Sequence, residues 1–253
     1  MSDVDDALAL WALRQAGARI EAITTVFGNN TLEKVHAVAT ELGQRWDIPV
    51  FRGAAQPGDD RTPAVDRLLA HRGAVLAIGP QTNVAAALQR GASWSRLVLL
   101  GGTDRSMPNL RPLHTTELNF ALDEGAARVA LAHCTDLVPM EPCRDVLFRR
   151  ADFALLPPWM EERSRGWLRL GPVLTGRRAV VPWDLVAALY LLDPGGFTAE
   201  PRGVELDSSP LRRGYLRYTA GTTRVVTAAD EPTFRRRWQA LAVGHSTHPA
   251  ADR

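Results

Sequence analysis

Three carboxylates crowd the first residues of the chain, at Asp3, Asp5 and Asp6. Carboxylates this close repel one another unless solvent or a cation separates them, and Ca²⁺ takes several carboxylate and carbonyl oxygens as ligands. The alternative is a charged helix start, because acidic side chains stabilise the N-terminal end of the helix dipole. The spacing therefore leaves a hard-cation site and a helix start as two open interpretations.

Further polar or aromatic residues stand where an apolar run ends or where a helix begins. They are Asn29, Thr82, Glu117, Asn119, Trp183 and Asp184. Glu117 and Asn119 would share one side of an extended segment and could bind the two hydroxyls of a diol. Each residue also has an ordinary structural interpretation, as a turn, a helix cap, an exposed edge or a packed ring. Each signal is weak in isolation.

Apolar and β-branched runs alternate with helix-forming segments along most of the chain. Strands are expected at 20–26, 49–51, 75–78, 97–100 and 136–139, with later strand-like runs at 215–218 and 224–227. Helices are expected at 7–15, 34–42, 83–89, 124–133, 184–192 and 233–243, whereas Pro and Gly interrupt 157–172. This alternation predicts one Rossmann-like α/β domain, with a mainly parallel central sheet flanked by helices. Such sheets bind ligands at the carboxyl ends of their strands.

The composition is that of an ordinary globular protein. The 253 residues are 45% hydrophobic and 23% charged, which excludes a disordered chain or a fibre. A net charge of +2 gives no reason to expect nucleic acid or a membrane surface as a partner. We recognise no signal peptide or membrane span, and two cysteines, Cys134 and Cys143, favour plain thiols in the cytoplasm. We expect one domain over 3–243 and a disordered tail over 244–253.

The order of the motifs resembles that of the inosine–uridine-preferring nucleoside hydrolase family. The matching segments are DDALAL at 5–10, ITTVFGN at 23–29, GPQTN at 79–83, LLGG at 99–102, ELNF at 117–120 with Asp123, and WD at 183–184. The similarity runs from residue 3 to about residue 194 and continues more faintly toward the C-terminus.

What the resemblance implies is hydrolysis of the N-glycosidic bond of a ribonucleoside, to ribose and free base, by a water that Ca²⁺ activates. The matched positions assign the ion to Asp6, the Thr82 carbonyl and Asp184. They assign the ribose to Asp5, Asn29, Asn109, Glu117 and Asn119. Acidic residues suit this chemistry, because an oxocarbenium-like transition state needs negative charge near the sugar. The resemblance also implies a role in purine salvage and a homodimer or homotetramer.

The chain departs from the family pattern in three places. The family's first strand and leading D-x-D would lie before Met1, so Asp3 is the candidate to replace the aspartate that takes the water's proton. Trp183 stands where many members have a histidine acid, and purine-specific members stack a tryptophan there on the base. The usual substrate loop is absent from the short 54–74 connection, so a wall of the base pocket is expected to be missing. We therefore expect catalytic roles for Asp3, Asp5 and Trp183, and a preference for purine nucleosides.

The alternative is a protein that is not an enzyme: a catalytically silent homologue that binds ribosides or serves as a regulatory or structural subunit. The absent D-x-D favours it and predicts poor hydrolysis by the 253 residues, whereas the retained carboxylates and amides favour the hydrolase. A dinucleotide-binding oxidoreductase is disfavoured, because no G-x-G-x-x-G follows an expected strand.

Overall fold

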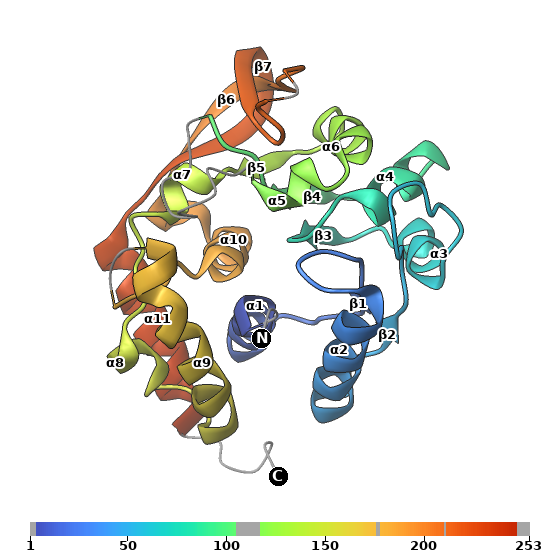
Figure 1. Cartoon of the computed structure of the whole chain (residues 1–253). Helices are drawn as coiled ribbons and strands as arrows, with labels where there is room; N and C mark the ends of the chain where they lie inside the picture. Colours follow the sequence, from blue (N-terminus) through green and yellow to red (C-terminus); the bar gives the residue numbers. More distant parts are fainter. Residues whose placement is uncertain (1–3, 105–116, 176–177, 210, 247–253) are drawn as a thin grey trace.

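The computed structural model describes residues 4–104, 117–175, 178–209 and 211–246, and the strands in these ranges form two sheets. β1 (Ile23–Thr24) and β2 (Val50–Phe51) make a two-stranded sheet. The larger sheet has the order β3-β4-β5-β7-β6, with β3 (Ala74–Ala77), β4 (Arg96–Leu100), β5 (Asp136–Val138), β6 (Phe197–Leu206) and β7 (Leu216–Ala229). Among these strands only β6 and β7 pair antiparallel. The expected Rossmann-like α/β fold with a mainly parallel sheet is confirmed (Figure 1).

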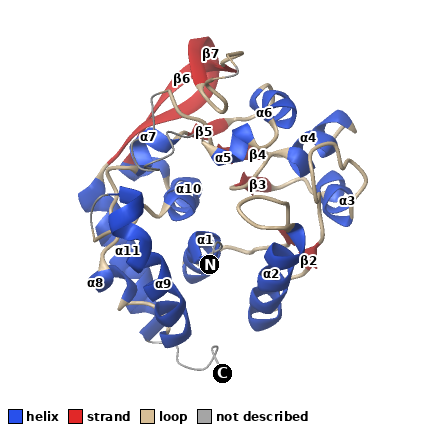
Figure 2. Ribbon diagram, in the orientation of Figure 1, coloured by secondary structure: helices blue, strands red, loops and turns tan. Residues whose placement is uncertain are grey.

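Helices flank the larger sheet on both faces (Figure 2). They are α1 (Val4–Gln15), α2 (Leu32–Trp46), α3 (Pro63–Ala70), α4 (Thr82–Gln89), α5 (Leu118–Ala121), α6 (Glu124–Leu131), α7 (Met140–Cys143), α8 (Arg150–Phe153), α9 (Pro158–Thr175), α10 (Trp183–Leu192) and α11 (Glu231–Ser246). In β4, Val98 and Leu100 pack in the core with α1, α10 and α11. Leu97 and Leu99 pack in a second core with α4 and α6. This alternation follows from the two-residue period of a strand that is buried on both faces.

A buried charge network fastens the amino-terminal end of the larger sheet. The carboxylate of Asp136 in β5 is fully buried and accepts hydrogen bonds from Arg96 in β4 (3.0 Å), Arg224 in β7 and Tyr190 in α10 (2.6 Å). Burial alone would raise the pKa of Asp136, but these donors and Thr135 outweigh it and lower the pKa to about 2. One carboxylate thus joins three strands and a helix.

Several boundaries differ from the sequence-based expectations. α9 runs unbroken over Pro158–Thr175, although Pro and Gly predict interruptions there. Pro158 suits the first turn of the helix, and an interior glycine costs only about 1 kcal/mol relative to alanine. Pro172, in contrast, lies inside the helix, where a proline removes a backbone hydrogen bond and costs about 3 kcal/mol, which the packing of α9 must offset. The strand expected at 20–26 shrinks to the two residues of β1, β6 is an unexpected strand, and both late strand-like runs lie in or beside β7.

Two further segments are more helical than expected. The 54–74 connection contains α3, whose N-cap residue Thr62 accepts a hydrogen bond from the backbone N–H of Val65 (3.3 Å). α11 continues to Ser246, so 244–246 belong to this helix, while 247–253 lie outside the described residues. Within the described ranges, no helix combines the length and hydrophobicity needed to cross a bilayer.

The two sheets do not join. β1 pairs with β2 and β3 pairs with β4, so β1 and β3 are each the edge of their own sheet. The consequence for packing is visible in β3, where Val75, Leu76 and Ala77 are only partly buried, whereas Leu97–Leu100 of β4 are fully buried. The parallel sheet is therefore interrupted between β1 and β3.

Candidate functional site

A cavity of about 910 Å³ reaches from the interruption between the sheets to the carboxyl ends of β1 and β3. Three of the predicted site residues line it: Asp6 from α1, Asn29 from the loop after β1, and Asn119 from α5. Asn29 is exposed, whereas Asp6 and Asn119 are half-buried. The structure thus brings side chains from three distant segments to the edge where parallel sheets bind their ligands.

Asp5 faces the N-terminal end of α10. The backbone of Asp184, Trp183 and Leu185 donates hydrogen bonds to its carboxyl group. Burial, followed by the charge of neighbouring Asp6, nevertheless raises the pKa of Asp5 well above its ordinary value. Its Oδ1 atom is buried without a hydrogen-bond partner. An orphaned carboxylate oxygen is costly, and a bound cation or hydroxyl would offset that cost.

Glu117 caps α5 and is not part of an extended segment as the sequence predicts. Its carboxylate accepts hydrogen bonds from the backbone N–H groups of Asn119 (2.5 Å) and Phe120 (2.8 Å). Burial raises the pKa of Glu117 to about 7 despite these bonds. The Asn119 side chain donates from Nδ2 to the carbonyls of Ile78 and Leu100, both at 3.1 Å. It therefore ties together the ends of β3 and β4 beside the cavity.

A second carboxylate, the half-buried Glu141 in α7, neighbours Glu117 and contributes to its raised pKa. The Oε1 atom of Glu141 accepts hydrogen bonds from the Thr103 hydroxyl and from the backbone N–H of Asp104 (2.9 Å). Its Oε2 atom is buried without a hydrogen-bond partner. Burial raises the pKa of Glu141 as well. The site edge thus carries one buried and one half-buried carboxyl group, Glu117 and Glu141, both with raised pKa values, beside the loop that follows β4.

Both thiols are buried, and one lies beneath the site. Burial raises the pKa of the Cys143 thiol well above its ordinary value, and the charges of Asp5, Glu141 and Asp184 add to this. Burial also raises the pKa of Cys134, to about 12. Both cysteines are therefore neutral free thiols at physiological pH.

Thr82 and Asn83 begin α4, and their side chains form hydrogen bonds that hold other segments of the chain in place. The Thr82 hydroxyl donates to Asp123 (2.6 Å), the residue that also caps α6. The Thr82 carbonyl lies in the first helical turn, where carbonyls accept hydrogen bonds along the helix. The Asn83 amide donates to the carbonyl of Thr25 and accepts from the N–H of Ala54, both at 2.9 Å. The ligand role of the Thr82 carbonyl stays a prediction.

Trp183 and Asp184 form the first turn of α10. Trp183 is half-buried and packs against the main core, and Asp184 is buried. Asp3 and Asn109, two other predicted site residues, lie outside the described residues. The catalytic roles of Asp3, Asp5 and Trp183 stay predictions.

The carboxylates at the start of α1 fit part of a hard-cation site. Asp5 and Asp6 are adjacent, one oxygen of Asp5 is orphaned, and the backbone of Asp184 contacts Asp5. Ca²⁺ prefers such oxygen ligands. In the parts of the chain that the structure describes, however, no three His, Cys, Asp or Glu side chains cluster closely enough to hold a metal ion.

Sequence reasoning did not single out Glu141 or the carbonyl of Ile78. Glu141 follows the end of β5 by three residues, so the preference of sites for carboxyl ends of strands could have found it. Ile78 contributes only a backbone oxygen, for which no side-chain pattern gives a signal.

Comparison with known proteins gives consistent matches. The model of the family described as inosine-uridine preferring nucleoside hydrolase matches residues 2–236. Uridine nucleosidase 1 of Arabidopsis thaliana is 25% identical, over 96% of this chain and 78% of the relative. Non-specific ribonucleoside hydrolase RihC of Salmonella paratyphi B is 28% identical, over 88% and 84%. The solved purine-preferring ribonucleoside hydrolase from Gardnerella vaginalis shares the fold, with a TM-score of 0.83 over 95% of each chain at 18% identity.

Proposed function

Because the chain belongs to the inosine-uridine preferring nucleoside hydrolase family and is by that membership an N-glycosyl hydrolase, we propose that it cleaves purine ribonucleosides in preference to pyrimidine ones. The observation that carries the proposal is the cavity lined by Asp6, Asn29 and Asn119 at the carboxyl edge. Carboxylates and amides at one edge suit a ribose, whose hydroxyls both donate and accept hydrogen bonds.

We propose that some residues at this edge bind the ribose hydroxyls and that others stabilise the transition state. Asn29, Asn119 and Glu117, with Asn109, are proposed to hold the ribose hydroxyls. Once a bound cation offsets the burial that raises the pKa of Asp5, Asp5 and Asp6 would be ionised and would supply negative charge beside the sugar, which stabilises an oxocarbenium-like transition state. Glu117 accepts a hydroxyl hydrogen bond best when ionised, so its raised pKa makes ribose binding stronger above about pH 7.

The ion is proposed to be Ca²⁺, held by Asp6, Asp184 and the Thr82 carbonyl. The orphaned oxygen of neighbouring Asp5 supports a cation at this place. When bound, such an ion lowers the pKa of a coordinated water and positions it. Asp3 and Asp5 are proposed to take that water's proton.

The leaving base is proposed to meet Trp183. Its half-buried ring at the start of α10 directly precedes Asp184, so it lies beside the proposed ion site. An aromatic ring stacks on either class of base, but a purine offers the larger face. Relatives include a uridine nucleosidase and a purine-preferring hydrolase, so the preference needs a direct measurement.

Hydrolysis of inosine and uridine by the whole chain tests this proposal. We expect kcat/KM to be higher for inosine, and Asp6→Asn to lower it by at least about 10²-fold, the usual scale for a group that acts on the reacting water. Asp66→Asn is the matched control, because Asp66 is exposed and pairs with Arg90 on the surface. A folded chain that hydrolyses neither nucleoside would contradict the proposal and favour the silent homologue.

Two further measurements separate the finer claims. Trp183→Ala should reduce inosine turnover far more than turnover of p-nitrophenyl riboside, whose leaving group needs no help. Calorimetric titration with Ca²⁺ should show one site per chain that Asp6→Asn weakens and Asp66→Asn does not. Equal losses on both substrates would assign Trp183 to packing, and an absence of Ca²⁺ binding would exclude this ion.

Assembly and location complete the proposal. We propose a homodimer or homotetramer that takes part in purine salvage, and the family resemblance supports this proposal. We propose that it lies in the cytoplasm, and its two free thiols support that location. Light scattering of the purified chain should give a mass of two or four times 27.7 kDa. A mass of 27.7 kDa would contradict the assembly.

A further inference from the structure

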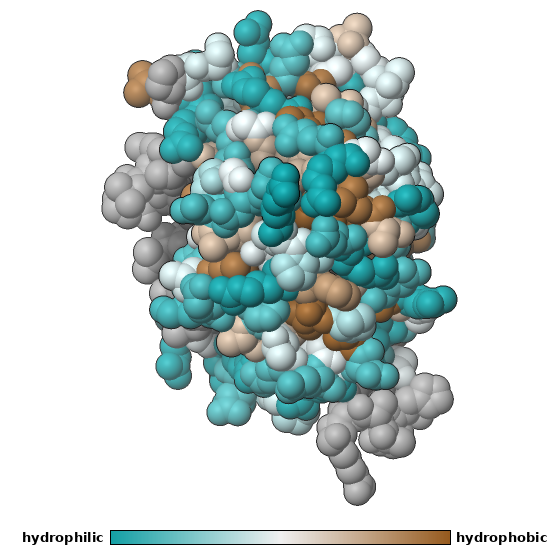
Figure 3. All heavy atoms as spheres, turned by 90° about the vertical axis from the view of Figure 1, so that its right-hand side faces the viewer, coloured by the Kyte–Doolittle hydropathy of each residue, from teal (hydrophilic) through white to brown (hydrophobic). Residues whose placement is uncertain are grey.

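The two sides of the candidate site differ in how firmly they are packed. On one side, Asn29 in the loop after β1 is exposed and Ile23 in β1 is only half-buried. Figure 3 shows brown apolar surface among polar side chains on this side of the molecule, where α2 and α3 lie. On the other side, Gly101, Gly102 and Thr103 of the loop that follows β4 are all buried. That loop is therefore the firmer support for a bound sugar.

The loop after β4 contacts the carboxylate of Glu117 directly. The backbone N–H of Gly102 donates a hydrogen bond to this carboxylate. Two further donors, the N–H groups of Asn119 and Phe120, belong to α5, the helix that Glu117 caps. The carboxylate is therefore held between its own helix and the loop, and its orientation depends on the position of Gly102.

The backbone of this loop is held from two sides. On one side, the carbonyl of Gly102 accepts a hydrogen bond from the N–H of Met140 (3.0 Å), at the start of α7. On the other side, the N–H of Thr103 donates to the carbonyl of Gly214 (3.2 Å), in the connection between β6 and β7. The carbonyl of Thr103 accepts from the N–H of Leu216 (2.8 Å), the first residue of β7. The loop thus lies between α7 and the hairpin of β6 and β7.

Glu141 in α7 adds a side-chain contact to the same loop. Its Oε1 atom accepts hydrogen bonds from the hydroxyl of Thr103 and from the backbone N–H of Asp104 (2.9 Å). Thr103 is fully buried, and a buried hydroxyl without a partner is unfavourable. Because α7 also binds Gly102 through the N–H of Met140, the backbone and a side chain of one short helix hold the loop at separate points.

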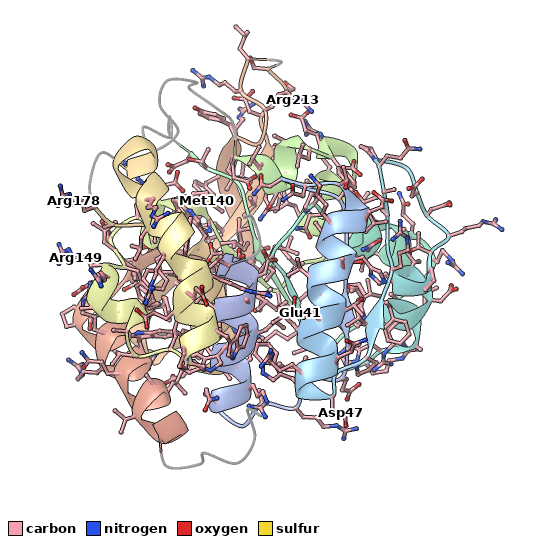
Figure 4. The ribbon with its side chains drawn as sticks, turned by 60° about the horizontal axis from the view of Figure 1, so that its bottom comes forward. Glu41, Asp47, Met140, Arg149, Arg178 and Arg213 are labelled. Carbon is pink, nitrogen blue, oxygen red and sulfur yellow. The ribbon has the colours of Figure 1, made fainter. Side chains whose placement is uncertain are left out.

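The connection between β6 and β7 fits closely against the start of α5. Gly214 has a φ of +76°, and a Cβ added there would lie 2.7 Å from the carbonyl oxygen of Glu117, which is closer than side chains pack. Arg213 donates a hydrogen bond to the carbonyl of Ala121 in α5 and pairs with Glu124 in α6 (3.6 Å). Figure 4 shows Arg213 above the green ribbon of these two helices. Because the loop after β4 is hydrogen-bonded to this connection, it cannot move away from α7 alone.

We propose that Glu141 is a positioning residue for ribose recognition, a role that rests on the proposed function of Glu117 as an acceptor for a ribose hydroxyl. By binding Thr103 and Asp104, Glu141 fixes the loop after β4. The loop in turn holds the N–H of Gly102 against the Glu117 carboxylate. Glu117 therefore meets the sugar with its oxygens already oriented, so less conformational freedom is lost on binding. Glu141 acts through Glu117 and does not itself contact the substrate.

Two variants at Glu141 separate this role from a purely structural one. Glu141→Ala removes the acceptor of both donors, whereas Glu141→Gln keeps a carbonyl oxygen that can accept them. We expect Glu141→Ala to raise KM for inosine at least about tenfold and to lower kcat less than about threefold, because the lost interaction acts equally on bound substrate and transition state. The KM of Glu141→Gln should stay within about threefold of the native value. A native KM in folded Glu141→Ala, or equal KM values in the two variants, would overturn the proposal.

Asp152 in α8 provides the matched control, away from the candidate site (Figure 1). Like Glu141, it is a carboxylate that accepts one backbone N–H, from Arg149 (2.7 Å), and one side-chain donor, Arg235 (2.7 Å). Asp152→Ala should lower the Tm but change KM for inosine by less than about twofold, because loss of folded enzyme reduces the apparent kcat and not KM. A rise in KM equal to that of Glu141→Ala would assign the effect to a general loss of stability and would overturn the proposal.

Hydrogen exchange without substrate gives a readout that does not depend on hydrolysis. Glu141→Ala should speed exchange of the N–H groups of Gly102 and Asp104 by at least about tenfold, with no change at Leu137 in β5. Thr103→Val removes only the hydroxyl, so it should have a smaller effect in the same direction. Unchanged exchange at Gly102 in Glu141→Ala would overturn the positioning role. A native chain that hydrolyses neither inosine nor uridine would instead contradict the proposed function, so the two failures are distinguishable.

Discussion

Strands β4 and β5 are packed more completely than strands β1 and β3, although both pairs consist of similar aliphatic residues. In β4 and β5, the aliphatic residues Leu99 and Leu137 are fully buried, whereas Ile23 in β1 and Leu76 in β3 are only half-buried. Each strand of the first pair has a neighbour on both sides, and each of the second pair has one. An apolar run therefore predicts a strand, but its burial depends on a partner that the run itself does not specify.

The difference also separates stability from ligand binding. The closed half, β4-β5-β7, is fastened by the Asp136 network at its amino end. The cavity lies along the open half, β1 and β3, and is lined at its carboxyl end by Asn29 from the loop after β1 and by Asp6 from α1. Asn119 joins the two halves through the carbonyls of Ile78 and Leu100. We therefore expect mutations in the closed half to act mainly on folding.

The largest effect is expected from breaking the closed half at Asp136. Asp136→Asn leaves the guanidinium groups of Arg96 and Arg224 without their carboxylate. Loss of one partner of a buried ion pair costs about 3–5 kcal/mol, and because the Arg224 side chain is 52% exposed and stays hydrated, we expect a loss at the lower end of that range. Urea denaturation should show this loss, whereas Asp66→Asn on the surface should change the free energy of unfolding by less than about 1 kcal/mol. A change below 1 kcal/mol for Asp136→Asn would show that the network does not stabilise the fold.

The same carboxylate gives a pH dependence with a definite sign. Because the folded pKa of Asp136 is lowered to about 2, its stabilising effect is complete above the unfolded pKa near 4 and is lost as the pH falls toward 2. The unfolding free energy of the native chain should therefore fall more steeply between pH 4 and 2 than that of Asp136→Asn. Parallel curves would contradict the assigned pKa.

The next prediction compares the same leucine-to-alanine substitution in β4, in the closed half, and in β3, in the open half. Leu99→Ala removes a fully buried side chain and should cost about 2–5 kcal/mol, the range for leucine truncations in cores. Leu76→Ala removes a side chain that already borders the cavity, so it should cost less than half as much. Both values come from the same urea titrations. Equal costs would mean that β3 is as well packed as β4 and would remove the contrast.

A smaller effect is expected from Glu117, which lies where the two halves meet. If Glu117 receives a ribose hydroxyl as proposed, its pKa of about 7 predicts that kcat/KM for inosine falls about tenfold for each pH unit below 7, as the carboxylate becomes protonated. The raised pKa also predicts stability that is complete below about pH 4.5 and is lost as the pH rises through 7. Glu117→Gln should abolish both dependences. A pH profile that keeps its slope near 7 in this variant would assign the slope to another group.

The smallest effect is expected at the contact that holds α2 against α9. Glu41 and Arg163 are both about half exposed, so Glu41→Gln should lower the free energy of unfolding by only about 0.2–1 kcal/mol. The variant should, however, speed hydrogen exchange in β1 more than in β5, because only the open half depends on this contact. Uniform acceleration across both strands would show that the halves open together.

The sequence predicts the order of elements well because local signals agree with the packing. β-branched and apolar runs at 75–78 and 97–100 fall on β3 and β4 to within a residue or two, and the helix expected at 184–192 matches α10. α9 escapes prediction because its glycines and prolines are tolerated once the helix packs on α1 and α8. β6 escapes because its outward residues, such as Glu200 and Arg202, give no apolar run.

For the candidate site, sequence reasoning finds side chains but not their neighbours. The resemblance of the ordered motifs to the nucleoside hydrolase family identifies Asp6, Asn29 and Asn119, and the structure places all three on one cavity. Burial raises the pKa of Glu117, and this burial depends on the tertiary packing around the carboxylate, which cannot be derived from ELNF. The same holds for Thr82, whose hydroxyl is taken by Asp123 from a helix 41 residues away in sequence.

The buried thiols described above bear on how the protein withstands oxidation. A thiol reacts with peroxide or a disulfide through its thiolate, and both Cys134 and Cys143 are kept protonated by burial. Both cysteines are buried, Cys134 with 8% of its surface exposed and Cys143 with none, so a disulfide between copies of the chain is disfavoured. The chain should therefore form no disulfide-linked dimers during storage in air without a reductant, and its two cysteines should react with alkylating reagents only after the chain unfolds.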